Sequence, residues 1–142
     1  LTINNITHMS TRGIRNCNPG NLRRSRDNWQ GLRKEQTDKD FFQFVTPEYG
    51  YRAMIITIRN YNRRYGLNTV SKIINRYAPP IENHTDNYIN YVAREMRVDP
   101  NEVIDTNDEA TMVEMVCAMS FVENGKKAIR CEVERGWELS LS

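Results

Sequence analysis

Glu123 is the one carboxylate that directly follows a strongly apolar run of the sequence. Between Met112 and Val122, only Glu114 and Ser120 are not apolar. A carboxyl group at the rim of an apolar core is poorly solvated in its charged form, so its pKa rises and it can hold a proton near neutral pH. A protonated Glu in such a place is what general acid catalysis requires.

The apolar run carries the start and end signals of a buried helix. Thr106, with Glu109 three residues later, predicts a capping box, and Asn124-Gly125 predicts the end of the helix. A helix that is apolar on almost all sides belongs in the centre of a domain. A Glu before Asn-Gly is also typical of a solvated surface residue, and a carboxylate there opposes the helix dipole. This segment alone leaves both interpretations open.

Length and composition indicate one soluble domain. The chain has 142 residues, and we expect residues 11–142 to form a single domain behind an N-terminal tail, residues 1–10. No apolar run approaches the roughly 18 residues of a membrane span, and no signal peptide is seen. The three cysteines lack metal-binding spacing and the two histidines are isolated. We therefore expect reduced, structural thiols and neither a metal nor a cofactor.

The net charge of +2 conceals an asymmetry between the two halves. Residues 1–78 carry 14 Lys and Arg against 5 Asp and Glu, whereas residues 79–142 carry 6 against 13. The basic half could face phosphate or another polyanion. The two halves could equally neutralise each other in the fold.

Periodicity and turn residues predict an α+β fold that is mainly α. Five helices are expected, at about 46–65, 68–77, 85–96, 107–124 and 126–137. The segments 32–36 and 41–45 are expected to pair as one β-hairpin with Asp38 near its tip. Asn18-Pro19-Gly20-Asn21 predicts a turn before the hairpin, and plain turn formation is the likelier local role of the two Asn residues.

Three stretches resemble a family of small phage and prophage proteins that are labelled virion structural proteins. They are RGIRNCNPGNLRRS, WQGLRKEQTDKDFFQFVTPEYGYRAM and TVSKIINRYAPPIENHTDNYINYVAREMRVDP. The resemblance covers roughly residues 12–125. It implies a phage virion, or a bacterial host that carries a prophage, as the location, and other virion proteins as partners.

A more distant likeness concerns the bacterial glucosaminidases of the lysozyme superfamily. Asn-Pro-Gly-Asn-Leu, Trp-x-Gly, a hairpin, Phe-x-Phe and a helix that opens with Thr-Pro-Glu follow that family's order. In that family the catalytic helix, which ends in Glu and a small residue, precedes this series. Here the matching helix and Glu-Asn-Gly lie at 107–125. The resemblance therefore implies a circularly permuted lysozyme-like fold with Glu123 in the catalytic position.

Cleavage of a glycosidic bond needs an acid and a second group that stabilises or attacks the oxocarbenium-like centre. By this resemblance Glu123 is the acid. Asp38 is the favoured second group because of its place at the hairpin tip, with Glu35 and the more remote Glu48 as alternatives. Each of these carboxylates has a plainer interpretation as a solvated turn residue. Without a second carboxylate, lytic transglycosylation becomes the better hypothesis.

The implied substrate is peptidoglycan, whose sugars present hydroxyl groups and apolar faces. Amides and aromatic rings suit such a ligand, and six candidates for its binding are Asn18, Asn21, Tyr49, Tyr77, Asn83 and Tyr88. A protein that keeps the fold and only binds cell wall or virion proteins is the main alternative. Nucleic acid is disfavoured as a partner because aromatic residues do not alternate with the arginines as a stacking surface requires.

Overall fold

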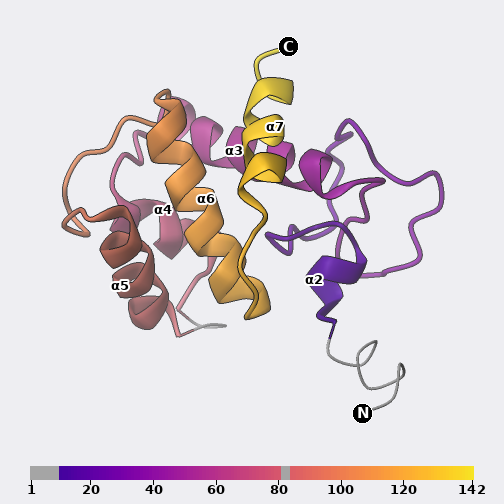
Figure 1. Ribbon diagram of the computed structural model, residues 1–142, viewed down its shortest axis with the longest axis horizontal. Coiled ribbons are helices and arrows are strands. Elements are labelled where there is room, and N and C mark those ends of the chain that lie inside the picture. The colour runs from indigo at the N-terminus through magenta and orange to yellow at the C-terminus, as the bar shows by residue number, and fades with distance from the viewer. Residues whose placement is uncertain (1–9, 81–83) are drawn as a thin grey trace.

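The computed structural model describes residues 10–80 and 84–142, and this part of the chain contains six helices (Figure 1). The prediction of a mainly helical fold is confirmed. The tail predicted at the N-terminus falls almost wholly outside the described residues. The helices are α2 (Arg12–Arg15), α3 (Pro47–Tyr65), α4 (Val70–Tyr77), α5 (Thr85–Met96), α6 (Glu109–Asn124) and α7 (Arg130–Leu139).

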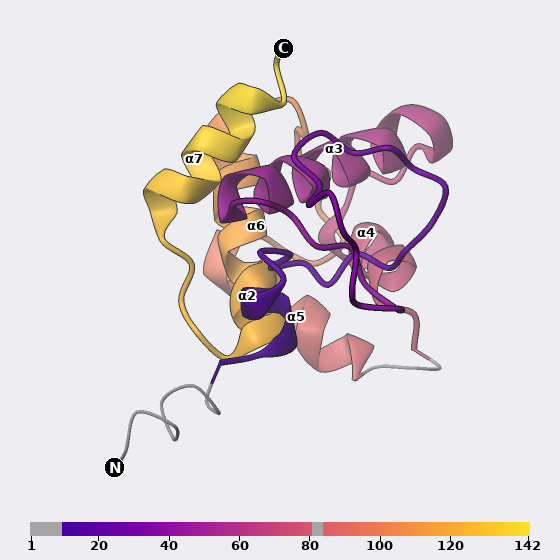
Figure 2. The ribbon, with the colours of Figure 1, turned by 90° about the vertical axis from the view of Figure 1, so that its right-hand side faces the viewer.

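The apolar helix predicted around Met112–Val122 is α6, and it lies in the centre of the molecule (Figures 1 and 2). It packs against α2, α3, α5 and α7. Its side chains Met112, Met115 and Met119 are fully buried in the main hydrophobic core. Burial on several sides explains why this helix lacks the polar face of an ordinary surface helix.

The predicted capping box at the start of this helix is wrong. The N-cap is Asp108, whose carboxylate accepts a hydrogen bond of 3.0 Å from the backbone N–H of Thr111. Thr106 lies before the helix with only 2% of its surface exposed. Asp108, directly before the first helical residue, occupies the N-cap position, because Asp is as good an N-cap residue as Thr.

The boundaries predicted for α3, α4 and α5 are confirmed to within two residues. Pro47 opens α3 and Gly66 ends it at a φ of 67°, a left-handed conformation that suits glycine. The last helix, α7, begins at Arg130, four residues later than predicted. The left-handed Gly125 ends α6, and residues 126–129 form a connector that brings α7 against α3 (Figure 1).

The predicted β-hairpin is wrong as a regular ladder. In the described residues of this region the strand-like contacts are isolated bridges, Arg23–Phe41 and Leu32–Phe44. Side chains supply part of the pairing. The Gln43 carbonyl accepts from the Arg33 N–H at 2.9 Å and from the Gln36 side-chain amide at 2.8 Å, and the Gln43 N–H donates to the Gln36 side-chain oxygen at 2.8 Å. Periodicity could not reveal that glutamine side chains take part in the pairing here.

The same region builds a second, smaller core over the start of α3. Phe42, Phe44 and Ala53 are buried, and the partly buried rings of Trp29 and Tyr49 pack against them. No helix in the described residues is both long and apolar enough to cross a membrane.

Candidate active site

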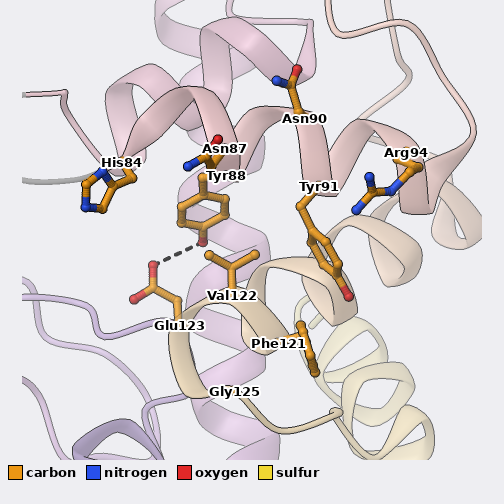
Figure 3. A pocket seen from close by; sticks show the side chains of 10 residues that line it. All are labelled: His84, Asn87, Tyr88, Asn90, Tyr91, Arg94, Phe121, Val122, Glu123 and Gly125. Carbon is orange, nitrogen blue, oxygen red and sulfur yellow. Dashed lines mark hydrogen bonds between the residues drawn. The ribbon is translucent and has the colours of Figure 1, made fainter.

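Glu123 lies in the last turn of α6, where its two carboxyl oxygens meet residues from distant parts of the chain. Asn21 donates from its amide to one oxygen at 2.9 Å, and the Tyr88 hydroxyl donates to the other at 3.0 Å. Figure 3 shows the Tyr88 contact. Burial raises the pKa of Glu123 above its ordinary value, and the two hydrogen bonds oppose this shift because they stabilise the charged form.

Asn124, the next residue, fixes the end of α6 against the N-terminal segment. Its amide donates to the carbonyls of Pro19 at 2.8 Å and Ser120 at 3.0 Å, and its oxygen accepts from the Thr11 hydroxyl at 2.7 Å. Thr11 also caps α2. Asn124 is buried, so these bonds fix the turn beside Glu123 without competition from water.

Gly13 in α2 permits this close approach. A Cβ atom at position 13 would lie 2.6 Å from the Asn124 side-chain oxygen and 2.8 Å from that of Asn21. Both distances are shorter than van der Waals contact allows. The glycine is therefore required for α2 to lie against the two amides that support Glu123.

Glu123 lines two hollows that lie on either side of it. The larger is a groove of about 910 Å³ between α5 and the end of α6 (Figure 3). The smaller is a pocket of about 160 Å³, lined by Gly20, Asn21, Arg23, Phe41, Tyr77 and Ala78 besides Glu123. Among the described lining residues, Glu123 is the one that the two hollows share.

Three of the predicted substrate-binding residues meet at Glu123. Asn21 and Tyr88 bond to it directly, and Tyr77 lines the smaller pocket while its hydroxyl donates to the Gly20 carbonyl at 2.6 Å. The pKa of each tyrosine is raised well above its ordinary value, mainly by burial and secondarily by the nearby Glu123 charge. Both phenols are therefore neutral hydrogen-bond donors at physiological pH.

Asn18 lies behind this site and lines neither hollow. Its side chain is fully buried, donates to the carbonyls of Leu22 and Phe42 and accepts from the Leu22 N–H. These contacts use its hydrogen-bonding groups for the turn itself. In this structure Asn18 stabilises the turn beside Glu123 through internal hydrogen bonds.

Tyr49 also has a structural position. Gly31 has a φ of 77°, and a Cβ atom there would lie 2.1 Å from Cγ of Tyr49. The ring therefore packs directly on the glycine of the Trp-x-Gly motif, which explains why that position must be glycine. Tyr49 lines neither hollow beside Glu123, and Asn83 lies outside the described residues.

None of the three predicted partner carboxylates lines the groove or the pocket beside Glu123, and Glu48 lies in the first turn of α3. Asp38 accepts from the Arg12 guanidinium at 2.6 Å, from the Asn16 amide and from the backbone N–H groups of Asp40 and Phe41. The Arg12 hydrogen bond is the main reason why the pKa of Asp38 is held far below its ordinary value. Glu35 is exposed, and neither residue lines the groove or the pocket.

The search with family models found no match to the chain. The chain is 38% identical over 133 residues to Protein P5 of Pseudoalteromonas phage PM2, and the match covers 91% of this chain and 81% of that protein. The chain belongs to the Protein P5 family. The P5 relative is a phage protein, which agrees with the predicted likeness to phage proteins. Its name describes no activity.

Sequence reasoning missed most of the larger groove of this P5-family chain. Its wall on α5 and α6 includes His84, Asn87, Asn90, Tyr91, Arg94, Phe121 and Val122. The signal that could have found them is the polar row at 87, 90 and 94, which follows the apolar positions of α5 at helical spacing. The described residues contain no cluster of His, Cys, Asp and Glu that could hold a metal ion.

Proposed function

We propose that this P5-family phage protein cleaves the glycan strands of peptidoglycan, with Glu123 as the general acid. The observation that carries the proposal is the position of Glu123. The group is largely buried with a raised pKa, and it lies between a groove and a pocket at the end of the central helix. Burial keeps the carboxyl group protonated to a higher pH than an exposed Glu would be, which suits donation to a leaving oxygen.

The proposed reaction begins when Glu123 donates its proton to the glycosidic oxygen. The bond between the anomeric carbon and that oxygen then breaks, and positive charge develops on the sugar ring. Among the described residues that line the groove and the pocket, Glu123 is the only carboxylate. This favours lytic transglycosylation. The sugar's own 6-hydroxyl attacks the anomeric carbon and returns its proton to Glu123, so no water is consumed.

The chain order also supports a circularly permuted lysozyme-like fold as part of this proposal. The turn that begins at Asn18 lies against the end of α6 through the Asn21–Glu123 and Asn124–Pro19 contacts. Residues more than 100 positions apart are therefore joined at the site. In the superfamily that the sequence resembles, the equivalent turn follows the catalytic helix directly.

Purified peptidoglycan tests the proposal directly. We expect the protein to lower the turbidity of a peptidoglycan suspension, and mass spectrometry of the products to show 1,6-anhydro ends. Reducing ends would show hydrolysis by water and would contradict the transglycosylase step. No soluble product from any peptidoglycan preparation, with a protein shown to be folded, would contradict cleavage itself.

The pH dependence of cleavage should follow the protonation of Glu123. Activity is expected to fall as pH rises through the raised pKa of Glu123, since the acid form is then lost. Tyr88→Phe removes a hydrogen bond that stabilises the carboxylate, so it raises the pKa further. In the pH–rate profile of Tyr88→Phe, the alkaline limb should therefore move to higher pH. A limb that stayed fixed, or moved to lower pH, would show that another group controls the profile.

A second candidate function is binding without cleavage, as a virion component that attaches to cell wall or to other virion proteins. The observation in its favour is that both Glu123 oxygens already accept hydrogen bonds from Asn21 and Tyr88, an arrangement that also serves a structural carboxylate. The phage relative, whose name carries no enzyme term, is consistent with it. Sedimentation of the protein with peptidoglycan, without any release of soluble fragments, would favour this function.

A further inference from the structure

The larger groove continues well beyond Glu123 along one side of α5. His84, Asn87, Tyr91 and Arg94 line it in order, with Arg94 at the end remote from Glu123 (Figure 3). At 1.5 Å per residue, the separation of ten positions between His84 and Arg94 corresponds to about 15 Å. A ligand that reached Arg94 would therefore extend past the bond that Glu123 is proposed to protonate.

The remote end of the groove combines an apolar wall with a cation. The rings of Tyr91 and Phe121 stack with centroids 5.3 Å apart and an interplanar angle of 22°. The Arg94 guanidinium lies 5.7 Å from the centroid of Tyr91. Contact with the ring face restricts the guanidinium, so it loses less freedom when it binds an anion in the groove.

The remote end of the groove carries a permanent positive charge. Among its described lining residues, Arg94 is the one permanently charged cation and Glu123 the one carboxylate. The raised pKa of Glu123 reduces negative charge at the opposite end. Asp86, which faces the adjoining hollow with His84 and Asn87, and Glu95, on the exposed side of α5, do not line the groove.

We propose that Arg94 binds a carboxylate carried by the glycan strand, while the Tyr91–Phe121 pair packs against the neighbouring sugar. This assignment rests on the proposed function for its substrate class. Peptidoglycan offers two such carboxylates, those of the stem peptide and the lactyl group that remains when the peptide is removed. Both share the planar geometry that a guanidinium binds through two hydrogen bonds. Arg94 thereby distinguishes peptidoglycan from an uncharged polymer of N-acetylglucosamine.

The test measures binding in a Glu123→Gln background, so that cleavage does not interfere. Three tetrasaccharides serve as probes: one with stem peptides, one treated with amidase so that only lactyl carboxylates remain, and the N-acetylglucosamine tetramer. Arg94→Gln should weaken binding of the first about tenfold, and Arg94→Lys less, since Lys keeps the charge without the planar fork. Arg135→Gln, an equal charge change at an exposed residue of α7, is the control.

The pattern across the probes decides the proposal. If Arg94→Gln weakens binding of the first two probes but not of the N-acetylglucosamine tetramer, Arg94 recognises the lactyl carboxylate. A loss with the first probe alone supports the stem peptide. Equal losses with all three, or none with any, would overturn it. Because the assay does not depend on catalysis, a wild-type protein that binds through Arg94 yet cuts nothing would overturn only the proposed cleavage.

Discussion

Glu123→Gln is expected to lower the rate of peptidoglycan cleavage by about 10²-fold or more while the protein remains folded. Gln has nearly the same shape and can still accept a hydrogen bond from Asn21 or Tyr88. It has no acidic proton to donate to the leaving oxygen. Initial rates of turbidity loss and the yield of soluble fragments measure the effect.

Glu35→Gln is the matched control because it makes the same chemical change at an exposed carboxylate outside the groove and the pocket. Its activity should stay within about twofold of wild type, since surface substitutions remote from a site have small effects. Full activity in Glu123→Gln would remove Glu123 from the mechanism. A loss in Glu35→Gln would restore Glu35 as a candidate for the second catalytic group.

The stability of the Glu123→Gln variant distinguishes the loss of a proton donor from damage to the fold. Burial raises the pKa of Glu123 above the unfolded-chain value of about 4.3, so in that interval the folded protein binds more protons than the unfolded chain. The contribution of Glu123 to the stability of wild type therefore falls as pH rises from about 4.3 through the folded-state pKa, and this loss persists above it. Glu123→Gln lacks the titration, so its stability relative to wild type should be higher at pH 7 than at pH 4.

The local features of the site could be predicted from the sequence. An apolar stretch that ends in Glu-Asn-Gly specifies both the central position of α6 and the end at Gly125, because these depend on neighbouring residues. The helices on either side follow from periodicity and from stop signals such as Gly66. The desolvation of Glu123 follows from its place at the rim of the core.

The contacts that complete the site could not be predicted, because they join distant segments. Asn21 meets Glu123 across 102 positions, and Asn124 reaches Pro19 across 105. Asp38 has the right residue type and a turn position for catalysis, yet Arg12 binds it through two hydrogen bonds that no local pattern indicates. Residue type and spacing therefore identified the candidate acid, whereas the choice between a candidate substrate contact and an internal support needed the tertiary structure.

Asn18 illustrates this difference, and Asn18→Ala is expected to destabilise the protein by about 3–5 kcal/mol. The substitution removes three internal hydrogen bonds at a fully buried side chain, with lengths of 3.0, 2.9 and 2.9 Å. It leaves the Phe42 carbonyl and the Leu22 N–H without these bonds, while the Leu22 carbonyl keeps its hydrogen bond of 3.0 Å from the Phe42 N–H. For a domain of this size we expect the midpoint of thermal unfolding to fall by roughly 10 °C or more.

Asn28→Ala, at an exposed position of the following loop, is the control and should change the midpoint by no more than about 2 °C. Asn18→Asp adds a sharper test. Its carboxylate can still accept from the Leu22 N–H but cannot donate to the two carbonyls, and it adds a buried negative charge beside them, so it should destabilise at least as much as Ala. If Asn18→Ala instead kept the wild-type midpoint and lost only peptidoglycan binding, Asn18 would be a substrate contact. The turn would then be held mainly by Asn124 and Tyr77, whose hydrogen bonds reach it from α6 and α4.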